Sequence, residues 1–185
     1  MDEQELILEA KAGNSKALAK LVKKYEKTIY SFAFKVCRNP DKAENTMQET
    51  FMSMVRSLKQ FDGKSKLSTW LYRITANHCL MQYRKKSHEF VSVDDEDTLI
   101  GERSIADWKS VPSFSLENEE LKLVLDEAIK KLSPEYRIVF LLRDVEELST
   151  EETGIITNLS VPAVKSRLHR ARAFLRQEIS RTYNK

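Results

Sequence analysis

The sequence has few of the residues that break a chain into short strands. Its 185 residues include 4 glycines and 4 prolines, too few for the many turns of a β-sandwich or barrel. No apolar run approaches the roughly 18 residues of a membrane-spanning helix. The start, with Asp2, Glu3 and Glu5, is acidic where a signal peptide is basic. We therefore expect an all-helical protein of the cytoplasm.

Cysteine is scarce as well, which argues against a metal site or an enzyme. Cys37 and Cys79 lack the paired spacing of a zinc site or a disulfide framework. His78 precedes Cys79, but consecutive helix residues do not face one another, so the two make a poor nucleophile and base. We expect two buried thiols, no catalytic residue, no metal and no cofactor.

Charge is plentiful and unevenly distributed. The chain has 31 basic and 28 acidic residues, for a net charge of +3. By segment, the net charge is +8 over residues 1–86, −8 over residues 87–120 and +3 over residues 121–185. Such asymmetry is typical of proteins that contact nucleic acids. Residues 63–87 and 153–177 contain bases and no acids, whereas ordinary solvated faces mix both signs.

The first basic segment predicts a group of capped helices. Apolar residues over 18–29 recur at helical spacing. Asp41 and Glu44 have the spacing of a capping box for a second helix, which ends near Gly63. Ser68 is the expected N-cap of a third helix, which ends in a basic run. The expected apolar side of the second helix comprises Ala43, Met47, Phe51, Met54, Val55 and Leu58.

Helical periodicity fails in the middle of the chain. The stretch is acidic, contains glycine, proline and serines, and is about twice as long as unstructured loops within compact domains. We therefore expect residues 1–88 to form one small helical domain, residues 89–116 a flexible acidic linker and residues 117–185 a second helical domain. The linker's charge suits either a solvated tether or a segment that enters a basic channel of a partner.

The second domain has the pattern of a helix-turn-helix. Ser149 and Glu152 form a capping box for a short helix that stops near Asn158. A longer helix follows from about Val161, and the succession of short helix, tight turn and helix is the motif itself.

The last helix has an apolar stripe beside a cationic one. Its apolar residues recur at four, three and four positions: Val164, Leu168, Ala171 and Leu175. Such a helix can pack on its own domain while it lies in a DNA major groove. The residues expected to reach bases or phosphates are Ala163, Lys165, Ser166, Arg167, His169, Arg170 and Arg172.

Four segments together resemble the bacterial extracytoplasmic-function (ECF) RNA polymerase sigma factors. In the second domain they are residues 132–144 (LSPEYRIVFLLRD) and 164–172 (VKSRLHRAR). In the first domain they are residues 43–51 (AENTMQETF) and 69–77 (TWLYRITAN). The segments follow the family's order and spacing, and the resemblance spans most of the chain outside the linker.

The resemblance implies a dissociable initiation subunit of RNA polymerase with no catalysis of its own. The first domain would bind core RNA polymerase through Glu44, Gln48, Glu49 and Met52. It would also hold the opened minus-ten element of promoter DNA through Lys64, Lys66, Trp70, Arg73, Asn77, Arg84, Lys85 and Lys86. The second domain would read the duplex minus-thirty-five element, and an anti-sigma factor would be a further partner. The tryptophan's spacing favours a core position first and a stacking surface second.

The sequence departs from the family at several positions. Asn45 stands where an aspartate is usual, and Pro162-Ala163 replace a usual Gly-Thr. Thr153-Gly154 replace the usual Ile-Ala, and glycine costs about 1 kcal/mol of helix propensity while it allows helices to cross closely. These changes predict weaker polymerase binding and an altered minus-thirty-five preference.

A second interpretation is a helix-turn-helix regulator that binds duplex DNA and never joins polymerase. It accounts for the second domain but leaves the helix around Glu44 and the basic helix around Trp70 without a role. Retention of core polymerase by the first domain would distinguish the two interpretations.

Overall fold

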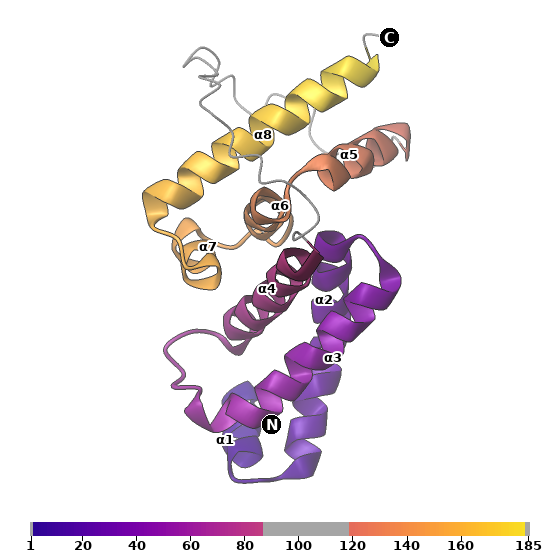
Figure 1. The fold of residues 1–185 in the computed structure, drawn as a ribbon. Helices are drawn as coiled ribbons and strands as arrows, with labels where there is room; N and C mark the ends of the chain where they lie inside the picture. Colours follow the sequence, from indigo (N-terminus) through magenta and orange to yellow (C-terminus); the bar gives the residue numbers. More distant parts are fainter. Residues whose placement is uncertain (1, 87–118, 184–185) are drawn as a thin grey trace.

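The computed structural model describes residues 2–86 and 119–183, which form helices and no strand (Figure 1). The all-helical prediction is confirmed for these ranges. The predicted linker, residues 89–116, lies outside them. The elements are α1 (Glu3–Lys11), α2 (Ser15–Cys37), α3 (Pro40–Ser57), the 3-10 turn η1 (Leu58–Gln60), α4 (Leu67–Lys86), α5 (Glu119–Lys131), α6 (Pro134–Phe140), the π-helical turn η4 (Leu141–Val145), α7 (Thr150–Thr157) and α8 (Val161–Tyr183).

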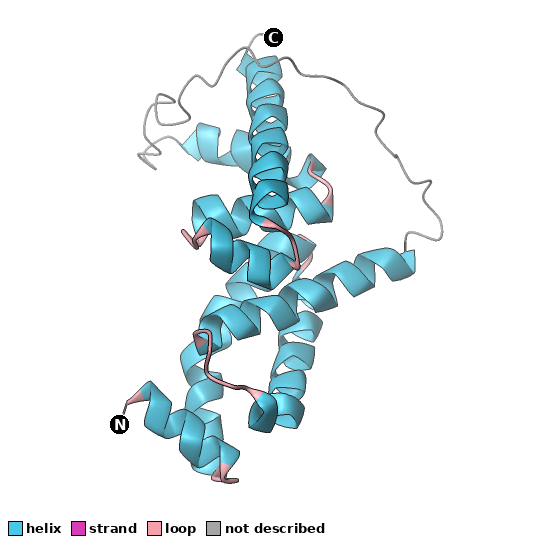
Figure 2. Cartoon of the chain, turned by 90° about the vertical axis from the view of Figure 1, so that its left-hand side faces the viewer, coloured by secondary structure: helices cyan, strands magenta, loops and turns pink. Residues whose placement is uncertain are grey.

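The helices form two groups, one stacked on the other (Figures 1 and 2). In the first group α2 packs against α1, α3 and α4, and in the second α8 packs against α5, α6 and α7. The groups meet where α4 packs on α7 and α2 packs on α6. Helix α1 has no fully buried residue, which explains why apolar periodicity does not predict it.

Side-chain caps start most of the helices. The Asn14 side chain accepts hydrogen bonds from the backbone N–H groups of Lys16 and Ala17, at 3.0 and 3.2 Å, and so begins α2. The predicted capping box of Ser149 and Glu152 is confirmed, with reciprocal bonds of 3.0 and 2.9 Å at the start of α7.

Two predicted helix starts are wrong by one or two residues. Helix α3 is capped by Asn39 and not by Asp41, because Pro40 takes the first helical position, where its missing N–H leaves no bond unmade. Helix α4 begins at Leu67, so Ser68 lies inside it. The first error arises because Asn39 and Asp41 both carry a plausible start signal.

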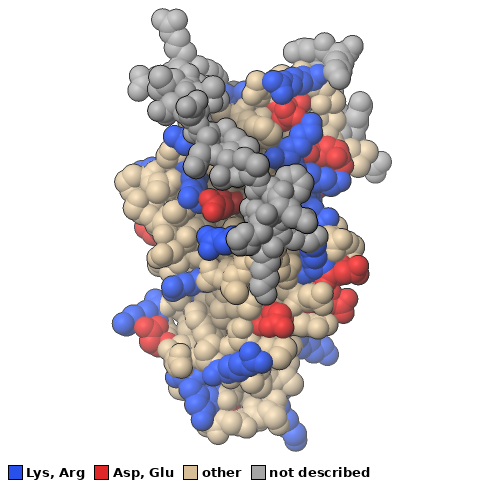
Figure 3. Space-filling view, in the orientation of Figure 1, with Lys and Arg blue, Asp and Glu red and all other residues tan. Residues whose placement is uncertain are grey.

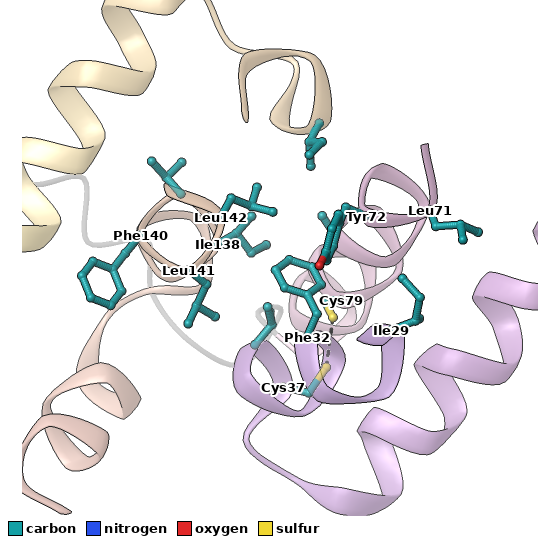
Figure 4. Close-up of a cluster of buried hydrophobic side chains, with 14 of the residues drawn as sticks. Ile29, Phe32, Cys37, Leu71, Tyr72, Cys79, Ile138, Phe140, Leu141 and Leu142 are labelled. Atoms are coloured by element: carbon teal, nitrogen blue, oxygen red, sulfur yellow. Dashed lines mark hydrogen bonds between the residues drawn. The ribbon is translucent and has the colours of Figure 1, made fainter. Parts of the chain in front are cut away.

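One buried apolar cluster extends through both groups of helices. At the junction Ile138 and Leu142 lie opposite Phe32 and Tyr72 (Figure 4). The rings of Phe32 and Tyr72 meet edge to face at 4.9 Å between centroids, a favoured aromatic geometry. The two groups are therefore joined by packing as well as by the chain.

Arg137 joins the two groups through its guanidinium, although its side chain is buried (4% exposed). Its Nη1 donates to the Val36 carbonyl at 2.6 Å and to the Tyr83 hydroxyl at 3.1 Å, both in the first group. The other donors reach carbonyls at the end of α5, those of Ile129, Lys130 and Leu132. All five N–H donors are thus used, and the cation lies at two helix C-termini, which carry partial negative charge.

Ion pairs and a tyrosine add to the junction. The Glu146 carboxylate accepts from Lys35 Nζ at 2.9 Å and from the Tyr72 hydroxyl at 2.7 Å. Burial and this carboxylate raise the pKa of Tyr72. Arg38 Nη2 lies 2.6 Å from Asp126 Oδ1. Each contact links a residue of the first group to one of the second.

The two cysteines are buried, as predicted, and they touch. Cys37 Sγ lies 3.1 Å from Cys79 Sγ (Figure 4). This contact lowers the pKa of Cys37 to about 7, and with burial it raises the pKa of Cys79. Nothing in the 42-residue separation indicates this proximity, which follows from the packing of α2 on α4.

The described helices give no sign of a membrane span or a metal centre. None of them is long and apolar enough to cross a membrane. Across residues 2–86 and 119–183, no three side chains of the metal-binding types gather at one place.

Candidate nucleic-acid interface

The exposed face of α3 carries the four residues predicted to bind polymerase. Glu44, Gln48, Glu49 and Met52 are all exposed, and Gln48 Nε2 lies 3.4 Å from Glu44 Oε1. The opposite face is buried in the first group, through Ala43, Thr46, Thr50, Phe51 and Met54. Val55 corrects the predicted apolar side, because it is 51% exposed. The surface therefore combines carboxylates and an amide with exposed apolar side chains.

Helix α4 separates its polar face from its buried face. One side of the helix carries Trp70 and, at helical spacing after it, Arg73, Asn77 and Arg84. The last three are exposed. The other side builds the core through Leu71, Tyr72, Thr75, Ala76 and Cys79. No described residue forms an ion pair with either arginine. Lys85 and Lys86 lie in the last turn, and their side chains are outside the described part.

Trp70 is half-buried and packs on the end of the preceding turn. Its ring lies 5.2 Å from that of Phe61, which is buried (6% exposed). The tryptophan thus packs against the apolar cluster, as predicted, while part of it remains accessible.

The loop before α4 presents two exposed lysines. Gly63 adopts a φ of 72°, a left-handed conformation that favours glycine. Lys64 Nζ lies 3.4 Å from the Asp62 carboxylate, and hydrogen bonds from Lys64 lower the pKa of Asp62. Lys66 Nζ lies 3.9 Å from Glu152 in α7, so this loop also borders the second group.

The turn between α7 and α8 explains why Gly154 stands where the family usually has alanine. Asn158 ends α7 in the left-handed conformation, and Leu159 N–H donates to the Gly154 carbonyl at 3.0 Å. A Cβ at Gly154 would lie 2.7 Å from the Leu159 carbonyl oxygen and 3.8 Å from a Val164 methyl. The close approach of backbone therefore requires glycine here.

The first turns of α8 place most of the predicted DNA-contacting residues at the surface. Lys165, Ser166, His169 and Arg170 are exposed, and Ala163 is half-buried. The apolar stripe is buried as predicted, with Val164, Leu168, Ala171 and Leu175 on the core side. Basic side chains lie over both groups in the view of Figure 3.

Two predicted DNA-contacting arginines of α8 have partners inside the protein. Arg172 donates to both oxygens of Asp144, at 2.9 and 2.6 Å, and this bond raises its pKa. Arg167 Nη1 lies 3.4 Å from Glu135 and its guanidinium lies 6.0 Å from the Tyr136 ring centre. Arg172 therefore holds α8 on its group, and Arg167 is partly used in the same way.

The sequence pattern does not reveal Arg137 or Glu146 as residues of the junction. The partners of Arg137 lie on α2, on α4 and at the end of α5, which its own position in α6 does not indicate. The one available signal is its place among consecutive apolar residues, where an unpaired charge would be costly.

Each group of helices matches a known protein family. The sigma-70 region 2 family matches residues 21–89, and the sigma-70 region 4 family matches residues 122–175. The ECF RNA polymerase sigma factor SigW of Bacillus subtilis is 33% identical over 176 residues, which cover 94% of each chain. The RNA polymerase sigma-H factor of Pseudomonas aeruginosa is 29% identical over 174 residues, covering 92% of this chain and 90% of that protein.

Solved structures share the fold. CnrH, solved in complex with the cytosolic domain of CnrY, has a TM-score of 0.68 at 23% identity, covering 96% of this chain and 97% of that one. The sigma factor RpoE of Bartonella quintana, solved with the anti-sigma factor NepR, has a TM-score of 0.65 at 22% identity, covering 89% and 98%.

Helices that carry regions 2 and 4, in this order and fold, define a sigma-70 type initiation factor. Within that class the chain belongs to the ECF RNA polymerase sigma factors. It is an alternative sigma factor, and the match to region 2 disfavours a regulator that acts through its helix-turn-helix alone.

Proposed function

We propose that this chain binds core RNA polymerase and directs it to open and transcribe its own set of promoters. Residues 1–88 would bind the polymerase and the minus-ten element, and residues 117–185 would bind the minus-thirty-five element. Residues 89–116 would link the two domains. The observation that supports this best is the division of α4, which exposes Arg73, Asn77 and Arg84 on one face.

The face of α4 suits an opened strand. Exposing bases costs a few kcal/mol for each unstacked step, and a captured base returns roughly 1–3 kcal/mol through stacking and pocket contacts. The Asn77 amide can both donate to and accept from a base edge. Arg73 and Arg84 would hold phosphates, and the accessible part of Trp70 offers a stacking surface.

The start of α8 suits a duplex. Lys165, Ser166, His169 and Arg170 are exposed on the first turns, where a recognition helix in the major groove meets base edges. Ala163 N–H donates to the Ser160 hydroxyl at 3.3 Å. With Pro162 unable to donate a backbone bond, we expect the lysine and arginine side chains to make the phosphate contacts.

The exposed α3 face would dock on the polymerase. Its Glu44 and Glu49 offer carboxylates, and Met52 (46% exposed) offers an adaptable apolar contact. Asn45 is exposed beside them, where an aspartate would add a negative charge. We expect this surface to bind a basic patch of the polymerase.

An anti-sigma factor is a second protein partner in this proposal. The CnrH and RpoE structures are complexes with CnrY and with the anti-sigma factor NepR. We further propose that the chain acts in the cytoplasm, where the polymerase and promoter DNA are found, and that it serves a stress or envelope regulon.

Run-off transcription with purified core polymerase tests the proposal. On a library of upstream sequences, the full chain should produce transcripts from a defined subset, and core polymerase alone should produce none from it. The pair E44A/E49A should reduce retention of core polymerase, and the pair R73A/N77A should leave retention intact while it abolishes permanganate reactivity of thymines near the start site.

Lys59→Ala is a matched control, because Lys59 is exposed next to α3 but outside both faces. It should behave as the unmodified protein does in both assays. Failure of the full chain to retain core polymerase at low salt would sink the proposal.

A further inference from the structure

The outer face of α2 carries six exposed residues that no part of the proposed function uses. They recur at four, three, four, three and four positions, so they share one side of the helix. We call them the α2 stripe: Lys16, Lys20, Lys23, Lys27, Tyr30 and Phe34. The opposite side of the helix is buried, through Leu21, Tyr25, Ile29, Phe32 and Val36.

The lysines of the stripe are not engaged by the fold. Elsewhere on α2, Lys24 pairs with Glu3 and Lys35 pairs with Glu146. The four stripe lysines have no ion pair with any described residue, and no acidic residue lies within the stripe. Glu26, the acidic residue of α2, is exposed at the edge of the stripe, four positions before Tyr30. A solvated helix face usually mixes both signs, so a row of four lysines without an ion pair is unusually cationic.

The stripe ends in two aromatic rings at the surface. Tyr30 and Phe34 are 37% and 38% exposed, and they are the aromatic members of the exposed large apolar residues in the described chain. Their ring centres lie 6.4 Å apart with planes 17° from parallel. Nearly parallel exposed rings are surfaces on which nucleic-acid bases stack, whatever the sequence.

The dimensions of the stripe match a short single strand. At 1.5 Å per residue the stripe is about 27 Å long, and successive lysines are about 4.5–6 Å apart along the axis. At about 3.4 Å per nucleotide this length covers roughly eight nucleotides. Single-strand sites of roughly 4–16 nucleotides combine these two features, a cationic track and aromatic platforms.

We propose that the α2 stripe is a binding track for single-stranded nucleic acid, with the lysines on phosphates and Tyr30 and Phe34 against bases. The track goes beyond the promoter contacts proposed above, because it lies opposite the side of α2 that packs in the first group and shares no residue with α4 or α8. A strand of opened DNA and a strand of RNA both offer this chemistry.

Fluorescence anisotropy with the full chain and a labelled 20-nucleotide DNA strand, or an RNA strand of the same sequence, tests the track over a range of salt. The triple variant K20A/K23A/K27A should lower the slope of log K against log salt by about 2, since each lost single-strand phosphate contact removes about 0.7. Alanine favours exposed helix, so the variant should fold. The DNA and RNA arms identify which strand binds more tightly.

The pair Y30A/F34A should weaken binding at least about five-fold with an unchanged salt slope, because stacking releases no counterions. The control R56A/K59A removes exposed charge from α3 and η1 that, like the stripe lysines, forms no ion pair with a described residue, and its slope should fall by less than half as much for each charge removed.

Three results would overturn the track. One is an equal loss of slope for each charge removed in the control, which would mean diffuse charge only. Another is equally tight binding of a 20-base-pair duplex that also depends on the stripe. The third is a stripe variant that loses binding to anionic vesicles or to core polymerase and keeps its binding to single strands. The promoter proposal is tested separately by R73A/N77A, which leaves the stripe intact.

Discussion

Helices α4 and α8 both carry basic residues where DNA contacts are expected, but the fold uses those residues differently. On α4, Arg73 and Arg84 are exposed and have no ion pair with a described residue. On α8, Arg172 is bound to Asp144 and Arg167 lies between Glu135 and Tyr136. The number of basic residues in the sequence therefore reflects the number of cations available for DNA on α4, but it overstates that number on α8.

The difference has a physical origin in what each helix must pack against. Helix α4 buries a wide apolar side and leaves its cations to solvent. Helix α8 packs against α5, α6 and α7, and acids of α6 and of the turn η4, Glu135 and Asp144, lie near its flanks and bind its arginines. Arg137 is the clearest case of an arginine used by the fold, since all of its N–H donors bond to groups of the protein.

The largest expected effect is that of Arg137→Ala. The change removes five hydrogen bonds. The Val36 and Ile129 carbonyls keep a second donor, whereas the other three acceptors lose the N–H groups of Arg137, and each unmet buried acceptor costs roughly 1–3 kcal/mol before relaxation. We expect the free energy of unfolding to fall by at least about 3 kcal/mol in urea titrations followed by circular dichroism. Arg137→Lys should recover part of this loss, because its three donors can serve some of the carbonyls.

Tyr83→Phe is the control for the junction. It removes one of the two bonds by which Arg137 reaches the first group, together with the hydroxyl's own contacts to the Val36 and Cys37 carbonyls, and leaves the α5 carbonyls bound. We expect a loss of about 0.5–1.5 kcal/mol. If Arg137→Ala cost no more than this, Arg137 would contribute no more to stability than a surface arginine does. The contrast between arginines used by the fold and the exposed arginines of α4 would then fail.

The overall architecture is predictable from sequence, whereas the junction is not. The cap at Ser149 and the buried stripe of α8 follow from local spacing and are confirmed. The contacts of Arg137 with Val36 and Tyr83, and the Cys37–Cys79 pair, join residues that are 42 or more positions apart. Such contacts depend on helix packing, which local periodicity does not encode.

The second effect in size is that of Gly154→Ala. Alanine gains about 1 kcal/mol of helix propensity, but its Cβ would lie 2.7 Å from the Leu159 carbonyl oxygen. Because backbone must move, we expect a net loss of about 1–3 kcal/mol. Thermal unfolding gives the stability, and anisotropy with duplex promoter DNA should show weaker binding because the turn orients α8. A more stable protein would show that α7 and α8 can move apart.

A double-mutant cycle on Arg172 and Asp144 tests whether α8 uses this arginine in the fold. Arg172→Ala, Asp144→Ala and the double variant should give a coupling free energy of about 1–2 kcal/mol, reduced by solvent screening because the arginine is one-third exposed. Urea titrations of the four proteins measure it. A coupling free energy near zero would mean that the fold does not depend on this ion pair and that Arg172 is available for DNA.

The smallest effect on stability, and the sharpest test of the comparison, comes from Arg73→Ala. Since Arg73 is exposed and unpaired among the described residues, its loss should change the free energy of unfolding by less than about 0.5 kcal/mol. Its loss should still lower the salt slope of single-strand binding by about 0.7. Arg172→Ala should do the reverse, with a measurable loss of stability and little change in single-strand slope. If the two arginines behaved alike in both measurements, the division between a cation left for DNA and a cation bound by the fold would be wrong.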